Sequence, residues 1–600
     1  MKIQKSDSEI MEEYGMAELP LILYKLYKKY NANYELIDIG GDCMFRFGET
    51  NVANVSYLAT YVNFLKIEQD ILRIEGNVSW PTVLLEHFQL YIEINGELHT
   101  CEMYDAGLDK SMDGEVYETR TAFVYQMQLE DMKEYRIRFV YSCKGIHTYS
   151  GKINYMRFSP IADVLENQYA QRNGWILKNI GACIHIQLGV PENILQSEDD
   201  FCDSIKREDV IRIRKKYFEK KQVKNKQIWL FMDRIDRADD NGEVFFRYMN
   251  RRHLGKVDCY YVIDKNSPDY NRMKRYGRVI AALSDEHKIL LPLADYIFTS
   301  QLNGWVENPY GDEEEYFRDI YHQAKVVFLQ HGVTKDDHTK WLNRINQDCH
   351  AVVSSAESEQ QAFLDGDYFY KPEQIWNTGM PRFDRLYKRR AKYILFVPTW
   401  RKGMMEQQYD DAVGIYKWVI KENGAENQYF KRYSEILSDE TFITNCRKKG
   451  YKVCYMPHPL IEPYIKNMKI SQNVEIIEKN TPWRDIFAKS AIMVTDYSSV
   501  AFDFAFLKRT IVYYQFDKNT FFTGHTYSKG YFDYVRDGFG EVVESREDLL
   551  EALYNAMERK GRMSDKYTQR VKEFYTYMDK KNCKRLYKKI TEEQNDTRQL

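Results

Sequence analysis

Residues 492–503 read IMVTDYSSVAFD, and this stretch decides the class of fold. An apolar run ends in Thr495 and Asp496, and two serines then open a segment in which apolar residues recur at helical spacing. The pattern predicts a buried strand that leads into a helix, with Ser498 or Ser499 as the N-cap residue of that helix. Free backbone amides and the positive end of the helix dipole make such a point a candidate site for a phosphate group.

Similar apolar runs recur through the second part of the chain in two series. The first is IWLFMD, CYYVID, VIAAL, YIFTS and VVFLQHG, and the second is YILFVPTW, YKVCYMPH, VEII, AIMVTD and TIVYYQF. Helical stretches or loops separate these runs, which is typical of a parallel α/β sheet. The two series predict two Rossmann-like domains, residues 227–385 and 386–590, that face each other across a cleft.

The N-terminal part of the chain has a different pattern. Within residues 36–160, short runs alternate apolar with polar residues, and turn signals such as Asn95-Gly96 separate them. Several strands at this spacing predict a β-sandwich-like accessory domain. Residues 1–35 are predicted to form a helical segment, and residues 161–226 a helical basic connector.

Composition places the chain among globular proteins. It has 600 residues, a net charge of -3 and 44% hydrophobic residues, so no global field predicts a nucleic-acid partner. The ten cysteines are scattered and form no CxxC pair, which favours reduced thiols in a cytosolic protein over disulfides or a zinc site. No secretory signal and no membrane-spanning run are predicted.

Two basic stretches raise the alternative of contact with a membrane surface. Residues 19–30, LPLILYKLYKKY, combine apolar, aromatic and lysine residues, and residues 212–226, RIRKKYFEKKQVKNK, are strongly basic. For the first stretch, the favoured interpretation is a helix packed against its own domain with its lysines in water. The second is interpreted as a solvated helix that can also attract anionic lipid or a polyanionic polymer.

Polar residues follow four of the predicted strands. They are QHGVTKDD at 330–337, PTWR at 398–401, HP at 458–459 and TDYSS at 495–499. One histidine at a strand end is weak evidence, because most such residues are structural. Ligands of parallel α/β sheets bind beyond the carboxyl ends of the strands, so four such stretches from two facing domains predict a shared site.

Together with TGMPRFD at 378–384, these stretches resemble the CDP-glycerol glycerophosphotransferase family, which includes teichoic acid polymerases and primases. The family motifs stand here as QHGVTKDD, TGMPRFD, VPTWRKG, MPHPL and VTDYSSVAFDF, in the family's order, over residues 228–558. The resemblance implies an α/β, GT-B-like fold in which the first Rossmann-like domain binds the acceptor and the second binds the CDP donor. It also implies transfer of an alditol phosphate at the cytoplasmic face of the membrane.

The resemblance further implies roles for the strand-end residues. Transfer of glycerol phosphate or ribitol phosphate needs a base for the acceptor hydroxyl, groups that stabilise the pyrophosphate and the leaving CMP, and a pocket for cytidine. The predicted general base is His331, oriented by Asp336 or Asp337, because an imidazole titrates near neutral pH. His458, the fourth candidate catalytic residue, is expected to contact the donor phosphates from the opposite domain.

A second set of residues is predicted to bind the donor. Its members are Arg401, Thr399, Thr495, Asp496, Ser498, Ser499 and Asp503. Arginine suits bidentate binding of oxyanions, the serines offer hydroxyls and helix amides to the pyrophosphate, and Asp503 is expected to accept hydrogen bonds from donor hydroxyls. No second carboxylate stands near Asp496 in the sequence, so no metal ligand is predicted, and the sequence does not decide whether a divalent cation is needed. An alternative for Arg382 and Asp384 is a salt bridge that orders the connection between the two domains.

The resulting hypothesis is an enzyme that moves glycerol phosphate or ribitol phosphate from a CDP-alditol to a lipid-linked saccharide or a growing teichoic acid or capsular polymer. The enzyme is expected in the cytoplasm, peripheral on the inner face of the bacterial cell membrane. One alternative is a GT-B glycosyltransferase that uses a nucleotide sugar. Another is a non-catalytic protein that binds a cell-surface polymer through the β-sandwich. The choice between glycerol and ribitol lies in pocket shape, which no motif reveals.

Overall fold

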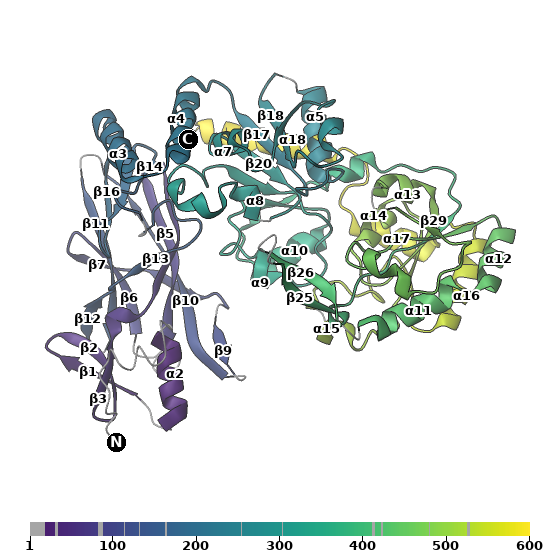
Figure 1. Cartoon of the computed structure of the whole chain (residues 1–600), viewed down its shortest axis with the longest axis horizontal. Coiled ribbons are helices and arrows are strands. Elements are labelled where there is room, and N and C mark those ends of the chain that lie inside the picture. The colour runs from purple at the N-terminus through teal and green to yellow at the C-terminus, as the bar shows by residue number, and fades with distance from the viewer. Residues whose placement is uncertain are drawn as a thin grey trace. The chain divides into compact units, whose positions relative to one another are not determined.

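The computed structural model (Figure 1) describes residues 19–30, 34–81, 88–107, 109–112, 115–130, 133–143, 145–162, 165–253, 255–302, 304–410, 415–421, 424–478, 481–524 and 528–599. The chain divides into two compact units. The first unit contains Met1–Gln227, Ala282–Asp295 and Asn303–Ala324, and the second contains Ile228–Ala281, Tyr296–Leu302 and Lys325–Leu600.

Two large β-sheets form the core of the first unit. One consists, in spatial order, of β13 (Ile153–Tyr155), β4 (Thr60–Glu68), β5 (Ile71–Pro81), β10 (Glu115–Gln128) and β8 (Glu102–Asp105), with β9 (Lys110–Met112) also paired to β10. The other consists of β14 (Tyr169–Arg172), β15 (Trp175–Asn179), β16 (Ile184–Leu188), β11 (Tyr135–Cys143), β6 (Phe88–Ile94) and β7 (Glu97–Thr100), with β12 (Ile146–Tyr149) also paired to β11. A smaller sheet contains β1 (Tyr34–Ile39), β2 (Asp42–Phe47) and β3 (Thr50–Asn54).

One apolar core joins these sheets. Ile74 and Phe123 from one large sheet and Ile92 and Phe139 from the other are fully buried in the same cluster. Successive side chains of a strand point to opposite faces, so strands that alternate apolar and polar residues can place one face in a shared core. The predicted sheet-rich N-terminal region is therefore confirmed.

The helix α2 (Leu19–Tyr30) packs against this sandwich. Leu19, Ile22, Leu23 and Leu26 are buried in the sandwich core, and their spacing places them on one face of the helix. Lys28, on the opposite side, is exposed. This confirms the interpretation of the segment as a helix that covers its own domain, with its apolar face unavailable to a membrane surface.

The predicted connector, residues 161–226, is only partly helical. Its first part contributes β14, β15 and β16 to the sandwich, and Trp175, Leu177 and Ile186 belong to the sandwich core. The prediction is corrected because these short apolar runs extend the sheet of β11, to which β16 pairs directly, rather than bridge two domains. The remaining helices of the first unit are α3 (Pro191–Ser204), α4 (Glu208–Val223), α7 (Asp285–Leu290) and α8 (Gly304–Glu307).

A buried arginine fastens a distant segment to the first unit. Arg214, on α4, is fully buried, and its Nη1 and Nη2 donate to the two carboxylate oxygens of Asp319 at 2.8 and 2.9 Å. Its Nε donates to Glu198 at 2.9 Å. The Arg214–Asp319 pair joins residues 105 positions apart and ties Asn303–Ala324 to the first unit, whose first segment ends at Gln227, one residue from the predicted limit at 226.

Two parallel sheets form the second unit. The first consists, in spatial order, of β19 (Arg278–Ala281), β18 (Asp258–Ile263), β17 (Ile228–Met232), β20 (Tyr296–Thr299), β21 (Lys325–Phe328), β22 (Ala351–Ser354) and β23 (Ile375–Asn377). The second consists of β28 (Glu475–Ile476), β27 (Lys452–Tyr455), β24 (Tyr393–Phe396), β29 (Ser490–Thr495), β30 (Thr510–Tyr514) and β31 (Gly540–Val543), and β25 (Met405–Asp410) with β26 (Ile415–Ile420) forms a separate hairpin. Parallel pairing in both large sheets confirms the predicted α/β class.

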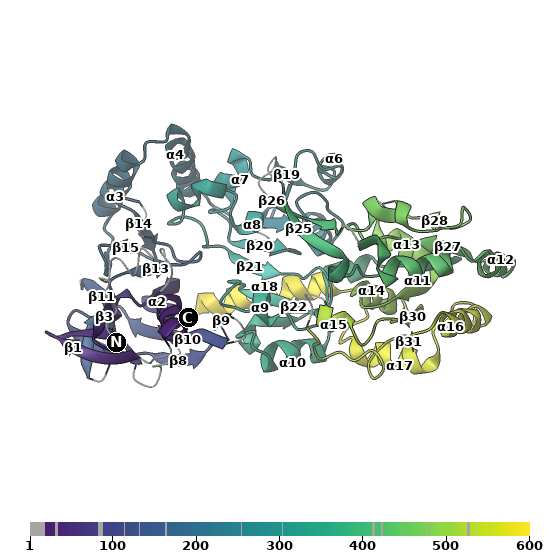
Figure 2. The same cartoon turned by 60° about the horizontal axis from the view of Figure 1, so that its bottom comes forward.

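The C-terminal helix packs on the first of these sheets. The helices of the second unit are α5 (Asn241–Arg252), α6 (Tyr270–Met273), α9 (Thr339–Leu342), α10 (Glu357–Asp365), α11 (Gln428–Leu437), α12 (Glu440–Lys448), α13 (Trp483–Lys489), α14 (Val500–Phe506), α15 (Phe521–Gly524), α16 (Arg546–Glu558), α17 (Asp565–Phe574) and α18 (Asn582–Gln599). Leu586 and Ile590 of α18 belong to the apolar core of the first sheet. In Figures 1 and 2 this helix, drawn in yellow, runs beside that sheet. The predicted domain 386–590 is corrected, because Leu586 and Ile590 pack on the first sheet rather than on the second.

Asp384 explains how α18 is held there. Its carboxylate accepts hydrogen bonds from the backbone N–H groups of Asn582 and Cys583, each at 2.9 Å, and so caps the start of the helix. The predicted salt bridge between Arg382 and Asp384 is wrong, because each residue binds other partners.

Two further properties concern the described residues. Among them, no helix is both long enough and apolar enough to cross a membrane. The ten cysteines all lie in the described part of the chain, and none of them forms a disulfide.

Arg214 provides a test of how the first unit is held together. Arg214→Ala leaves Asp319 buried without its partner, so we expect the free energy of unfolding to fall by about 3–5 kcal/mol. Urea denaturation followed by circular dichroism measures this loss. Arg212→Ala is the matched control on the same helix, because Arg212 and Asp285 form a pair with both side chains about half exposed. The control is expected to lose less than about 1 kcal/mol, and equal losses would contradict the assignment.

Candidate functional site

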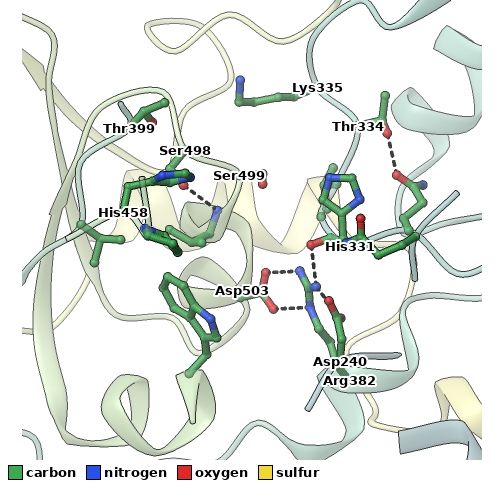
Figure 3. A pocket seen from close by; sticks show the side chains of 18 of the residues that line it. Asp240, His331, Thr334, Lys335, Arg382, Thr399, His458, Ser498, Ser499 and Asp503 are labelled. Atoms are coloured by element: carbon green, nitrogen blue, oxygen red, sulfur yellow. Dashed lines mark hydrogen bonds and ion pairs between the residues drawn. The ribbon is translucent and has the colours of Figure 1, made fainter. Parts of the chain in front are cut away.

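A pocket with a volume of about 580 Å³ lies in the second unit (Figure 3). Its lining comes from segments that follow β17 and β21 of the first sheet and β24, β27 and β29 of the second. These are the carboxyl ends of parallel strands, where α/β sheets bind ligands. The pocket therefore lies where the strand-end motifs predict a site.

Most of the predicted site residues meet in this pocket. Those that line it are His331, Asp336, Asp337, Thr399, His458, Ser498, Ser499 and Asp503. His331 and His458 lie on opposite sides of the pocket, with Ser499 and Asp503 between them in the view of Figure 3. Side chains from two sheets are thus brought to one space, as predicted.

Three predicted donor ligands lie outside the lining. Arg401 is buried and forms ion pairs with Asp496 at 2.9 Å and Asp517 at 2.6 Å. Asp496 also accepts a hydrogen bond from the Thr399 backbone N–H at 2.8 Å, and the Thr495 hydroxyl donates to a backbone carbonyl of the neighbouring strand end at 2.7 Å. The assignment of these three residues to donor contact is corrected. They hold the ends of β24 and β29 together, and thereby position Thr399.

His331 follows a residue with an unusual backbone conformation. Gln330 has a φ of 61°, in the left-handed region that residues other than glycine rarely adopt. Its buried side chain is held on two sides, because Nε2 donates to the Glu359 carboxylate at 3.0 Å and Oε1 accepts from the Thr334 hydroxyl at 2.6 Å. Backbone strain of this kind persists only where the surroundings impose it. This turn presents His331 to the pocket (Figure 3).

The imidazole of His331 is neutral at neutral pH. Desolvation by the surrounding protein, followed by the positive charge of Arg382, lowers its pKa to about 4. A hydrogen bond with the Ser300 backbone acts in the opposite direction, because it favours the protonated ring. The side chain is nevertheless exposed at the pocket surface, so an incoming hydroxyl group has access to it.

His458 presents a hydrogen-bond donor from the other side. Its Nδ1 accepts the backbone N–H of Leu460 at 3.2 Å, so the neutral ring carries its hydrogen on Nε2. Burial, followed by the positive charge of Arg234, lowers the pKa of His458 to about 4. At neutral pH both histidines are therefore neutral rings.

The start of α14 lies against the loop that carries His331. Ser499 occupies the N-cap position, as predicted, but its hydroxyl caps no amide of the helix, and Ser498 Oγ accepts only a long hydrogen bond of 3.4 Å from Val500. A Cβ atom added to Gly332 would lie 2.6 Å from Ser499 Oγ, so the two segments approach each other closely here. The serine hydroxyls and the first amides of α14 are thus held beside His331.

Arg382 joins the segments of the two sheets at this pocket. Its Nε and Nη2 donate to the two carboxylate oxygens of Asp503, on α14, each at 2.7 Å. Its Nη1 donates to Asp240, after β17, at 2.8 Å and to the carbonyl oxygen of His331 at 2.7 Å. Both oxygens of Asp503 thus hold Arg382 in place, and the predicted role of Asp503 in binding donor hydroxyls stays a prediction.

The two aspartates after His331 also have other partners. Asp336 forms an ion pair with Lys335, whose side chain is only 3% exposed. Asp337 accepts a hydrogen bond from the Thr339 N–H at 2.8 Å, and its own N–H donates to the Ser528 carbonyl at 3.0 Å. These contacts shape the loop, so the predicted orientation of His331 by Asp336 or Asp337 is replaced by contacts of Ser300 and Arg382.

Sequence reasoning missed several residues that line the pocket. They include Arg234, Asp240, Lys335 and Arg382. Arg234 and Asp240 follow the predicted strand IWLFMD, so the rule that located the other strand ends could have found them. Arg382 lies in the TGMPRFD stretch that supports the family resemblance, but the sequence does not reveal its two carboxylate partners, which lie 142 and 121 residues away.

Comparisons with known proteins agree with the motifs. The CDP-glycerol:poly(glycerophosphate) glycerophosphotransferase family model matches residues 213–592. The minor teichoic acid biosynthesis protein GgaB of Bacillus subtilis (strain 168) is 39% identical over 372 residues, which are 62% of this chain and 40% of that protein. A teichoic acid glycerol-phosphate transferase of Staphylococcus aureus (strain NCTC 8325 / PS 47) is 26% identical over 204 residues, 30% of this chain and 45% of that protein.

A solved structure of the wall teichoic acid polymerase TagF is similar to this chain, with a TM-score of 0.43 and 15% sequence identity. The match covers 66% of this chain and 100% of that chain. The chain spans less than half the length of each of the two curated relatives above. The family match, by contrast, covers more than half of this chain. The protein therefore belongs to the CDP-glycerol:poly(glycerophosphate) glycerophosphotransferase family.

Proposed function

We propose that this protein is an enzyme that transfers glycerol phosphate or ribitol phosphate from a CDP-alditol to a hydroxyl group of a lipid-linked saccharide or a growing teichoic acid or capsular polymer. The main observation behind this proposal is a single pocket in which two neutral histidines lie on opposite sides, beside the first amides of α14. Family membership supports the reaction class. The names of the relatives, which refer to teichoic acid biosynthesis and glycerol-phosphate transfer, support the substrate class.

His331 acts as the general base in this proposal. The acceptor hydroxyl gives its proton to the neutral imidazole while its oxygen forms a bond to the phosphorus that carries the alditol. The bond from that phosphorus to the bridging oxygen breaks, and CMP leaves with the bridging oxygen. A pKa of about 4 makes the free imidazole a weak base. The negative charges of a bound donor raise that pKa toward neutrality and so strengthen the base when substrate is present.

His458 and the start of α14 stabilise the donor phosphates. The Nε2–H of His458 donates to the phosphate that becomes CMP, whose charge increases as the bridging bond breaks. Ser498 and Ser499 offer hydroxyls, and the first amides of α14 add backbone donors at the positive end of the helix. The apolar lining residues of the second sheet, among them Ile477, Trp483 and Phe487, suit the cytosine ring.

The two parallel sheets of the second unit support a GT-B-like interpretation. The sheet that carries His331 would then belong to the acceptor domain, and the sheet that carries His458 and Ser499 to the donor domain. With a lipid-linked acceptor, the enzyme would work in the cytoplasm, peripheral on the inner face of the membrane, and the exposed Lys215 and Lys216 of α4 suit an anionic surface.

Flotation with vesicles of phosphatidylglycerol tests this location. Protein that stays at the bottom of the gradient would contradict it.

A donor screen tests the proposed reaction. The protein is incubated with CDP-glycerol, CDP-ribitol or UDP-sugars and a membrane fraction that contains lipid-linked acceptors. We expect release of CMP from at least one CDP-alditol. Release of UDP alone would indicate a glycosyltransferase, and no release from any donor would favour a polymer-binding protein.

The role of His331 predicts a specific pH dependence. His331→Ala is expected to lower kcat/KM for CMP release at least about a hundredfold, because it removes the proton acceptor. The neutral ring is the active form, so wild-type kcat/KM should be retained above the lowered pKa of about 4 and lost as the pH falls through it. His185→Ala, in the first unit, is the control and should keep both the rate and the profile. An acid limb at the ordinary imidazole pKa of about 6.5 would contradict this account.

A further inference from the structure

Arg234 lies where β17 ends, and its side chain belongs to the lining of the same pocket as His331 and His458. The backbone turns directly after it, since the Arg237 N–H donates to the Arg234 carbonyl at 3.3 Å. The Arg234 side chain is 51% exposed. A guanidinium at a strand end, open to the pocket, is available to a ligand.

The ion pair that Arg234 forms is a weak one. Its Nε donates to Asp236 Oδ1 at 3.0 Å and its Nη2 to Asp236 Oδ2 at 3.3 Å, and the Asp236 side chain is 50% exposed. Pairs between half-exposed side chains contribute little, because water competes for both partners. A phosphate group can therefore replace Asp236 at small cost.

Other arginines of the pocket are committed more strongly. Arg382 is bound by Asp503 and Asp240, and its side chain is 16% exposed. Arg385 pairs with Glu243, and Arg484 with Asp239; these arginine side chains are 24% and 22% exposed. Removing such cations from their carboxylates would leave buried charges unpaired. Arg234 is better suited than these three to bind an incoming anion.

Arg234 and both histidines line one pocket. Desolvation and the charges of Arg382 and His338 lower the pKa of His331, and the positive charge of Arg234 lowers it further. The hydrogen bond with the Ser300 backbone acts in the opposite direction. The charge of Arg234 also lowers the pKa of His458, for which burial is the largest cause and Arg234 the second. The two imidazoles lie on opposite sides of the pocket (Figure 3). Arg234 lies in the lining of this pocket with half of its side chain exposed, so it can reach a ligand held between the two rings.

We propose that Arg234 binds the phosphoryl group that is transferred, through charged hydrogen bonds to its non-bridging oxygens. The inference rests on the proposed function and adds a substrate-binding residue to it. The acceptor oxygen bonds to phosphorus, the bond to the bridging oxygen of CMP breaks, and the acceptor proton passes to His331, while Arg234 keeps its protons. The guanidinium fork suits two oxygens of one phosphoryl group, and its charge stabilises the transition state.

Substitution of Arg234 tests the proposal by kinetics. Arg234→Gln is expected to lower kcat/KM for CMP release about a hundredfold, because it removes a cation from the transferred group. Arg234→Lys should recover part of the loss and remain about tenfold below wild type, because a lysine keeps the charge but cannot form the fork. An unchanged kcat/KM in Arg234→Gln would overturn the proposal.

Asp236→Asn is the matched control. It removes the partner of Arg234 and keeps the guanidinium, so kcat/KM is expected to stay at or above the wild-type value. A loss as large as that of Arg234→Gln would show that the ion pair itself is needed for structure, and would overturn the proposal.

A second readout does not depend on turnover. Diethyl pyrocarbonate modifies neutral histidines, and mass spectrometry reports the modification of His331 and His458 separately as a function of pH. Removing the positive charge of Arg234 should raise the apparent pKa of both rings in Arg234→Gln. If neither apparent pKa rises, Arg234 does not lie between the two histidines, and the proposal fails.

The same assay separates this proposal from the proposed function. Inorganic pyrophosphate is the probe, and it should protect both histidines from modification in the wild-type protein and lose this effect in Arg234→Gln. Loss of protection supports the phosphate-binding role even if no CDP-alditol is turned over. Equal protection of both proteins would overturn the role of Arg234, whatever the donor screen shows.

Discussion

The pocket depends on one guanidinium. Arg382 donates to Asp503 on α14, to Asp240 after β17 and to the carbonyl oxygen of His331, so a single rigid group fixes segments that belong to both parallel sheets. Loss of one partner from a buried ion pair costs about 3–5 kcal/mol, because the other charge is left without compensation. The close contact of Gly332 with Ser499 allows this spacing. Arg382 therefore sets the distance between His331 and the first amides of α14.

The same arrangement accounts for the protonation of the site. Desolvation and positive charge both disfavour an imidazolium, so His331 and His458 are neutral although each lies in a polar pocket. A neutral His331 can accept a proton, and a neutral His458 with its hydrogen on Nε2 can donate one hydrogen bond. An anionic ligand in this pocket would reverse the electrostatic balance and raise the pKa of both rings. In the proposed reaction, binding of the donor would therefore strengthen the base that activates the acceptor.

The strand-end rule explains how much of this site could be predicted. It located His331, His458, Ser498 and Ser499, since parallel strands deliver the residues after them to one edge. It could not show that Arg401 turns inward to Asp496 and Asp517, because a pairing over 116 residues leaves no local pattern. In the fold, the parallel sheets were predictable from their apolar runs. The strands at 169–188 and the return of α18 to the first sheet were not, because both depend on long-range packing.

The most direct test of this account is a crystal or cryo-electron microscopy structure of His331→Asn with CDP-glycerol bound. This variant retains the fold around Arg382 while removing the proton acceptor. The account predicts the pyrophosphate at the start of α14, between His458 and position 331, with the alditol phosphate facing the substituted residue. A nucleotide bound elsewhere, such as on the sandwich of the first unit, would contradict it.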